Sequence, residues 1–162
     1  MVSWREVRVD EDAALALLTE YFSSRVESFP RSQGEYQTVF PSPDQFVPPH
    51  GVFLVVESED LSGEPADVGC GGIRRIELNN DTLVTFEVKH LWLQPHVRRF
   101  GYGRALMAEL ERRAVAFGAQ QLVLDSNQVL AAAAELYRTT GFVEVPPYND
   151  NPNANHWYAK AL

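Results

Sequence analysis

Residues 91–105 read LWLQPHVRRFGYGRA, and this stretch decides the fold. Apolar residues at its start are typical of a strand, a proline and two glycines indicate a turn, and the apolar residues that follow recur with helical spacing. Glycine lets the backbone turn tightly and approach a ligand closely, and the free N–H groups at a helix start favour a phosphate or pyrophosphate. The stretch therefore predicts a strand, an anion-binding turn at Gly101 and Gly103, and a helix.

Positive charge gathers in this turn, although the chain as a whole has a formal net charge of -8. Arg98, Arg99 and Arg104 would create a local anion site in an otherwise repulsive field. Two common phosphate loops are excluded, because the third glycine of the dinucleotide fingerprint and the Gly-Lys-Ser/Thr of a P-loop are missing. A strand-to-helix turn can also contain two glycines for backbone reasons alone, so the pattern leaves a purely structural role open.

Hydrophobic patterns on either side of the turn predict an α/β fold. A short opening strand is expected at Val7 and Val9, and a helix after Asp10 with Leu15, Leu18 and Phe22 on its apolar stripe. Further elements are expected as strands at 51–56, 68–76 and 83–93 with a hairpin turn at 79–81, a helix at 101–118, a strand at 122–124, a helix at 129–140 and a strand at 156–160. This order predicts a mixed, mostly antiparallel sheet with helices on both faces.

Composition is typical of one globular domain over residues 1–162, with 45% hydrophobic and 22% charged residues. No apolar run is long enough for a membrane span or a signal peptide, which predicts a cytoplasmic protein without a membrane partner. The single Cys70 cannot form an internal disulfide and is more typical of the core than of a nucleophile. Four scattered histidines give no zinc spacing, and the acidic charge argues against nucleic acid.

Arg98, Gly101 and Gly103 match the Arg/Gln-x-x-Gly-x-Gly/Ala signature for acetyl-CoA in the GNAT (GCN5-related N-acetyltransferase) family. The resemblance extends to residues 87–95, which are similar to the fourth strand of that fold. It continues at residues 134–142, which resemble the family's Leu-Tyr-x-x-x-Gly-Phe segment. The resemblance implies a GNAT-like fold and an N-acetyltransferase that uses acetyl-CoA as co-substrate and needs no metal.

In this family the pantetheine arm lies against a splayed strand, which implies backbone contacts from Leu91 and Leu93. The expected pyrophosphate turn consists of Arg98, Arg99, Phe100, Gly101, Tyr102, Gly103 and Arg104. Many members place an asparagine seven residues before the catalytic tyrosine, but this chain has Leu130 there. Asn127 is the candidate for that cofactor contact, unless the contact is absent.

The resemblance assigns Tyr137 as the general acid for the departing thiolate, the alternative being a half-buried aromatic on a helix face. An ordinary primary amine has a pKa near 10.4, so only about one molecule in a thousand is neutral near pH 7.4 and a base is needed. Glu87 is the candidate base by resemblance, and His90 and water are the alternatives. Glu87 or His90 would otherwise be a solvated strand residue.

Prolines restrict the loop at residues 146–152, which suits the wall of a pocket. Tyr148 and Asp150 are therefore candidates for binding the acceptor amine, although a turn-rich surface hairpin would contain the same residues. A small-molecule N-acetyltransferase is the main hypothesis. A protein N-terminal or lysine acetyltransferase and a non-catalytic acyl-CoA-binding sensor are the alternatives. The identity of the amine, the acyl length and a homodimer stay open.

Overall fold

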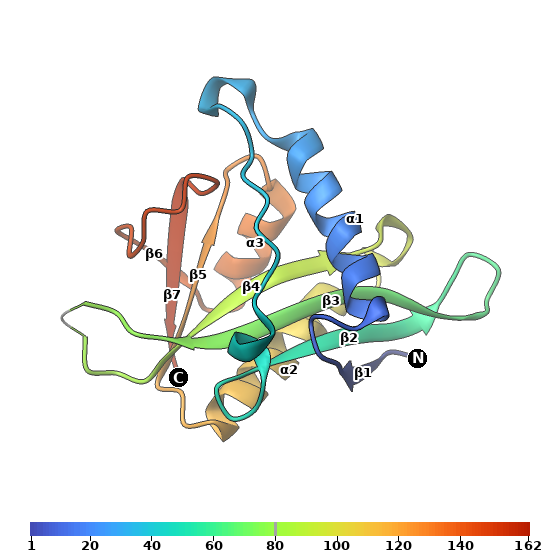
Figure 1. Ribbon diagram of the computed structural model, residues 1–162, viewed down its shortest axis with the longest axis horizontal. Helices are drawn as coiled ribbons and strands as arrows, with labels where there is room; N and C mark the ends of the chain where they lie inside the picture. Colours follow the sequence, from blue (N-terminus) through green and yellow to red (C-terminus); the bar gives the residue numbers. More distant parts are fainter. Residues whose placement is uncertain (80) are drawn as a thin grey trace.

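One mixed sheet organises the protein, in a computed structural model that describes residues 1–79 and 81–162. Its seven strands are ordered β1-β2-β3-β4-β5-β7-β6 (Figure 1). The strands are β1 Ser3–Glu6, β2 Gly51–Glu59, β3 Pro65–Ile76, β4 Thr85–Leu93, β5 Gln121–Ser126, β6 Val143–Val145 and β7 His156–Ala161. The helices are α1 Asp12–Ser28, α2 Tyr102–Ala116 and α3 Ala131–Thr139, with short 3-10 turns η1 Arg31–Gln33, η2 Pro43–Phe46 and η3 Pro95–Val97.

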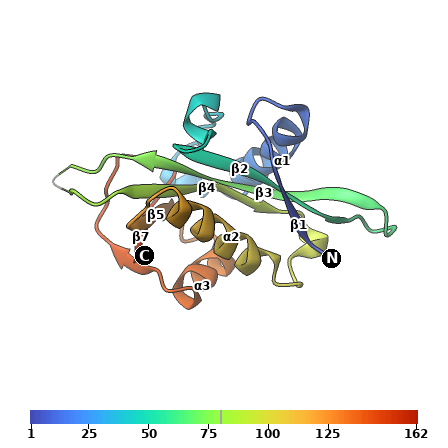
Figure 2. The ribbon, with the colours of Figure 1, turned by 90° about the horizontal axis from the view of Figure 1, so that it is seen from below.

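Helices cover both faces of the sheet, as the sequence predicts. Figure 2 shows α1 on one side and α2 and α3 on the other. Leu17 and Leu18 of α1 are buried in one apolar cluster, and Leu106 and Leu110 of α2 are buried in the other. All strand pairs except β4 with β5 are antiparallel, so the predicted mixed, mostly antiparallel α/β sheet is confirmed.

Three local predictions need correction. The opening strand is β1 and ends before Val7, because the chain turns there to bury Val9 under α1. Leu15 is 38% exposed and lies off the buried stripe of α1, which Leu17 occupies instead. The three-residue strand β6 has no counterpart in the prediction. The predicted hairpin turn at 79–81 includes Asn80, which lies outside the described residues.

The parallel strands β4 and β5 separate soon after they meet, and this separation positions the site. They pair only over Thr85–Glu87 and Gln121–Val123. Figure 1 shows the two arrows diverging beyond that point. The strand next to the Gly101 turn is therefore splayed from β5, as the resemblance implies.

A bulge in β4 lies at the same point. The register against β3 passes from Cys70 opposite Trp92 to Gly72 opposite Lys89, so β4 has one residue more than β3 in this interval. His90 has a φ of 59° there, a left-handed conformation that is uncommon outside glycine. The bulge changes the direction in which the following side chains point.

Candidate functional site

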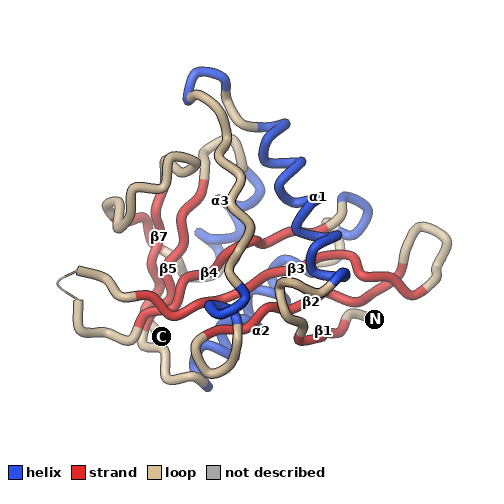
Figure 3. Tube along the Cα trace, in the orientation of Figure 1, coloured by secondary structure: helices blue, strands red, loops and turns tan. Residues whose placement is uncertain are grey.

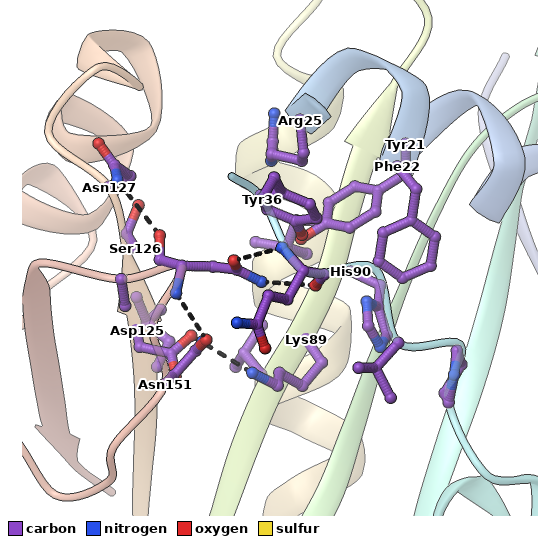
Figure 4. Close-up of a pocket in the computed structure, with 18 of the residues that line it drawn as sticks. Tyr21, Phe22, Arg25, Tyr36, Lys89, His90, Asp125, Ser126, Asn127 and Asn151 are labelled. Atoms are coloured by element: carbon purple, nitrogen blue, oxygen red, sulfur yellow. Dashed lines mark hydrogen bonds and ion pairs between the residues drawn. The ribbon is translucent and has the colours of Figure 1, made fainter. Parts of the chain in front are cut away.

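A pocket of about 520 Å³ opens where β4 and β5 part. Side chains from α1, from residues 36–42, from both parted strands, from α3 and from residues 149–154 line it. In Figure 4, Tyr21, Phe22 and His90 lie together on one side, and Lys89, Asp125 and Asn151 lie on the other. The pocket therefore joins segments that are far apart in sequence.

The turn before α2 presents free backbone donors. Gly101 precedes the helix with a φ of 76°, a conformation that favours glycine. Within the described part of the chain, the N–H groups of Tyr102, Gly103 and Arg104 have no backbone acceptor, as expected for a first helical turn. The helix dipole and these donors favour an anion at this place.

Gly103 differs from Gly101, because the fold itself does not require a glycine there. A Cβ atom at Gly103 would meet Leu136 at 3.5 Å and Leu93 at 3.6 Å, which are ordinary contacts. Its φ is not in the left-handed region. The missing side chain leaves space at the helix start that a ligand can use.

The arginines of the turn make different contacts. Arg98 folds back along β4, where its Nε donates to the Leu93 carbonyl at 2.9 Å and its guanidinium lies over Trp92. Arg104 donates to the Thr139 hydroxyl at 2.8 Å. Arg99 and the neighbouring Phe100 are exposed. All three arginines are exposed, but Arg98 and Arg104 also donate hydrogen bonds within the protein.

The edge of β4 that faces the gap exposes backbone groups. The Gln94 N–H donates to Val68 on the β3 side at 2.8 Å. Because successive residues of a strand alternate in direction, the backbone groups of Leu91 and Leu93 face the opposite edge. The Leu93 carbonyl is the one that Arg98 engages. Both residues lie where the resemblance expects the pantetheine arm.

Tyr137 reaches the pocket from α3, on the far side of the parted strands. Burial, followed by the charge of Tyr21, raises its pKa, while Arg25 and Ser126 act to lower it. The phenol therefore keeps its proton at neutral pH and can donate it.

Glu87 is only 1% exposed and does not line the pocket. Arg74 forms an ion pair with one carboxylate oxygen at 2.8 Å, and the Tyr148 hydroxyl donates to the other at 2.6 Å. Two of the residues expected in the site, Glu87 and Tyr148, are thus in direct contact with each other.

His90 lines the pocket and has an unusual environment. Within the described residues its Nδ1 has no hydrogen-bond partner. Its ring lies 5.4 Å from the centroid of Tyr21 and 5.6 Å from that of Phe22. Burial, and then the charges of Lys89 and Arg74, lower the pKa of His90 to about 3. The imidazole is therefore neutral at physiological pH.

Sequence reasoning missed a charged pair that joins the parted strands. Lys89 of β4 and Asp125 of β5 form an ion pair at 3.3 Å. Burial would raise the pKa of Asp125, but Lys89, Asn149 and Asn151 outweigh it, and the net shift is downward. Nothing in the local sequence around either residue indicates this pairing, because it depends on how the two strands meet.

The loop after β6 contributes to the pocket through residues other than those expected. Asn149, Asn151 and Asn153 line it, whereas the exposed Asp150 and the partly buried Tyr148 lie outside its lining. The sequence placed the loop beside the site but did not identify which side chains point inward.

Residues 34–42, here called the strap, run between η1 and η2 and appear in Figure 3 as a long tan segment in front of the sheet. Asn153 holds the strap through two hydrogen bonds to the Gln37 backbone, at 2.9 Å and 2.8 Å. Asn127 donates to the Gln33 side chain at 2.7 Å and to the Asn153 carbonyl at 3.2 Å. Asn127 thus lines the pocket and also contacts Gln33, directly before the strap, and Asn153, which bonds to the strap.

A known protein family matches the part of the chain that contains the gap between β4 and β5. The family model described as an acetyltransferase (GNAT) domain matches residues 49–144, more than half of the chain. The chain belongs to the GNAT acetyltransferase family. The match spans the β3–β4 hairpin, the Gly101 turn, α2, β5 and Tyr137, and so includes the gap between β4 and β5 and the turn before α2.

Proteins with similar sequences are also described as acetyltransferases. An uncharacterized N-acetyltransferase of Schizosaccharomyces pombe is 28% identical over 116 residues, 72% of this chain and 66% of the relative. An IAA acetyltransferase of Azospirillum brasilense is 35% identical over 82 residues, half of each chain. This GNAT chain spans from about a third to about two thirds of the length of the curated relatives it matches.

Solved structures share the fold. A protein of Klebsiella pneumoniae, provisionally described as an acyl-CoA N-acyltransferase, aligns with a TM-score of 0.71 and 23% identity over 100% of this chain and 98% of its own. The NatC complex bound to Gag peptide and CoA contains a chain that aligns with a TM-score of 0.67 and 15% identity, covering 99% of this chain and 98% of that one.

Two further properties concern the described residues alone. None of their helices combines the length and the apolar character needed to cross a membrane. They also contain no cluster of three or more histidine, cysteine or acidic side chains that would hold a metal ion.

Proposed function

We propose that this protein transfers the acetyl group of acetyl-CoA to the amine of a small molecule by direct attack. The observation that supports this most is the gap between β4 and β5, with the Gly101 turn at one end and the Tyr137 phenol beside the pocket. A thioester in that gap would have the acid on one side and the acceptor pocket on the other.

The cofactor is proposed to bind along the free edge of β4. Its pyrophosphate accepts hydrogen bonds from the N–H groups of residues 101–104, and Arg99 supplies an exposed positive charge. The pantetheine arm pairs with the backbone of Leu91 and Leu93. Asn127 is proposed to contact the cofactor only if it releases Gln33, because its amide group already donates within the protein.

The reaction requires one nucleophile and two proton transfers. The neutral amine nitrogen attacks the thioester carbonyl carbon, and a tetrahedral intermediate forms. When that intermediate collapses, the C–S bond breaks and the sulfur takes a proton from the Tyr137 hydroxyl, while the nitrogen loses its extra proton to a base. The upward shift in the pKa of Tyr137 suits this role, because the phenol stays protonated until the thiolate forms.

Glu87 is proposed as the base, acting through Tyr148 or water, because its carboxylate contacts Tyr148 instead of the pocket. His90 is the second candidate, since it lines the pocket and its buried Nδ1 has no hydrogen-bond partner among the described residues. The variants Glu87→Gln and His90→Asn distinguish the two candidate bases. The variant that lacks the base should have a lower kcat/KM and a shifted pH profile of kcat/KM, and the other variant should preserve that pH profile.

Two features favour a small molecule over a protein acceptor. The strap and the loop at 149–154 are joined by hydrogen bonds across the pocket, which restricts passage of an extended chain. The pocket volume of about 520 Å³ also falls within the range of about 300–1,000 Å³ that is typical of small-molecule sites. Tyr148 and Asp150 are proposed to border the entrance.

Thiol release from acetyl-CoA tests the proposal, measured with a panel of small amines and with short peptides. Amine-dependent release with the small molecules is expected. Release with peptides only would indicate a protein acceptor. Tight binding of acetyl-CoA without release under any condition would indicate a non-catalytic sensor.

A further inference from the structure

Among the described residues, Arg25 is the charged group in the pocket that has no counter-charge. The pocket lining contains three cationic side chains, Arg25, Arg74 and Lys89, and one carboxylate, Asp125. Arg74 is paired with Glu87 at 2.8 Å, and Lys89 is paired with Asp125 at 3.3 Å. Within the described residues, no ion pair or hydrogen bond engages the Arg25 guanidinium. The pocket therefore keeps one positive charge in a protein whose net charge is -8.

Aromatic side chains hold Arg25 and form the wall beside it. Its guanidinium carbon lies over the Tyr21 ring, 4.7 Å from the centroid, a cation–π contact that uses none of its N–H donors. Phe29 and Tyr36, whose ring centroids are 5.6 Å apart, continue the same wall of the pocket. An apolar ring can bind here while an anionic group reaches the guanidinium.

We propose that the acceptor is an amine that also carries a carboxylate and an aromatic ring, that is, an aromatic amino acid, and that Arg25 binds its carboxylate. This inference rests on the proposed function and specifies its substrate class. The planar guanidinium matches a carboxylate through two parallel N–H···O bonds, which a lysine cannot reproduce. An aromatic wall beside an unpaired arginine is the arrangement that such a ligand needs.

The position of Arg25 also suits the chemistry. Burial and Tyr21 raise the pKa of Tyr137 while Arg25 lowers it, so that Arg25 lies within electrostatic reach of the proposed acid. In an α-amino acid the amine and the carboxylate are attached to the same carbon. A carboxylate held by Arg25 therefore brings the amine to the region where the thioester is proposed to lie.

The test compares phenylalanine with phenethylamine, which has the same ring and amine but no carboxylate, and with alanine, which lacks the ring. We expect kcat/KM to be about 10- to 100-fold higher for phenylalanine than for phenethylamine, since a hydrogen bond to a charged group contributes about 1.5–3 kcal/mol. Alanine should also be used poorly. Arg25→Gln should bring the phenylalanine to phenethylamine ratio close to one, and Arg25→Lys should restore part of it.

Arg112→Gln is the matched control, because Arg112 is a helical arginine outside the pocket lining, and it should preserve the ratio. A second readout does not depend on turnover: calorimetry should show that N-acetylphenylalanine binds the wild type at least about tenfold more tightly than it binds Arg25→Gln.

Three results would overturn the inference while leaving the proposed function intact. These are equal use of phenylalanine and phenethylamine, acetylation of other amines only, or an Arg25→Gln variant that loses affinity for acetyl-CoA in place of the amino acid. A protein that fails to bind acetyl-CoA, or that releases thiol with no amine at all, would instead contradict the proposed function.

Discussion

The Gly101 turn, where we propose that the cofactor binds, and the pocket between β4 and β5, where we propose that the acceptor binds, are built in opposite ways. The turn lies within residues 98–104, and its free N–H groups follow from one helix start. The pocket combines side chains from α1, the strap, β4, β5, α3 and the loop at 149–154. One region depends on local backbone geometry, whereas the other depends on side chains that meet only in the folded chain. A single substitution in the turn should therefore have a large effect on cofactor binding alone. Substitutions in the pocket should have smaller effects on the binding of the amine, and these effects should depend on one another.

The largest effect is expected in the turn, from Gly103→Val. The added side chain fills the space at the helix start and blocks the approach of a pyrophosphate, so the Kd for acetyl-CoA should rise by about 100-fold, as expected for the loss of charge-assisted hydrogen bonds. Calorimetry measures the change. Ala108→Val is the control, since it places the same side chain on an exposed position of α2 and should leave the Kd unchanged. An unaltered affinity in a folded Gly103→Val protein would separate the turn from the cofactor.

An effect of similar size, on kcat instead of cofactor affinity, is expected where the two regions meet, at Tyr137. Tyr137→Phe removes the proposed proton donor and should lower kcat by about 100-fold with little change in cofactor affinity. Tyr158→Phe is the control, because its ring lies 5.4 Å from that of Tyr137 but does not line the pocket. Steady-state kinetics with a working amine would make the comparison. Equal kcat values for the two variants would assign Tyr137 to packing.

A smaller effect is expected from opening the pocket. Asn153→Ala removes both hydrogen bonds between the loop and Gln37 of the strap, so the closed pocket is populated less. The KM for the amine should rise by about tenfold, while the KM for acetyl-CoA should stay the same. Asn155→Ala, which removes a single bond from the Gln128 N–H elsewhere on this loop, is the control. Equal changes in both variants would contradict a specific role for the strap.

The smallest effect is expected from His90, on stability. Its folded pKa of about 3 lies below the ordinary value of 6.5, so between these values the unfolded chain binds a proton that the folded chain excludes. Stability should therefore fall as pH falls below about 6.5, by about 1 kcal/mol per pH unit from this group. His90→Asn removes the group and retains a residue that tolerates a positive φ. Thermal unfolding from pH 7 to pH 5 should show a steeper loss for the wild type, and parallel curves would contradict a buried neutral imidazole.

The contrast between the turn, which is local in the sequence, and the pocket, which distant segments form, also explains which features the sequence could predict. The strand, the turn and α2 follow from residues close together in the chain, where apolar spacing and two glycines suffice. The left-handed bulge at His90 has no sequence signal, because it reflects the register between β3 and β4. The Lys89 to Asp125 pair depends on two strands separated by a helix. Tertiary contacts of this kind cannot be predicted from local patterns.

Glu87 and Tyr148 illustrate what the sequence could not predict within the candidate site. The sequence indicated both as site residues, one as base and the other as an acceptor contact. In the fold Tyr148 donates to Glu87, and neither lines the pocket. Arg25, in contrast, was not selected, since an arginine near the end of an amphipathic helix is common on exposed faces. That it has no charged partner among the described residues becomes apparent only in the folded structure.

A crystal structure with CoA and an N-acetylated amino acid would show where the cofactor and the product bind. We expect the CoA sulfur between the parted strands β4 and β5, within hydrogen-bonding distance of the Tyr137 hydroxyl, and the pyrophosphate on the N–H groups of residues 101–104. We also expect the acetylated nitrogen on the α1 side of that gap. A sulfur atom outside the gap, or a pyrophosphate away from the start of α2, would rule out the proposed binding mode.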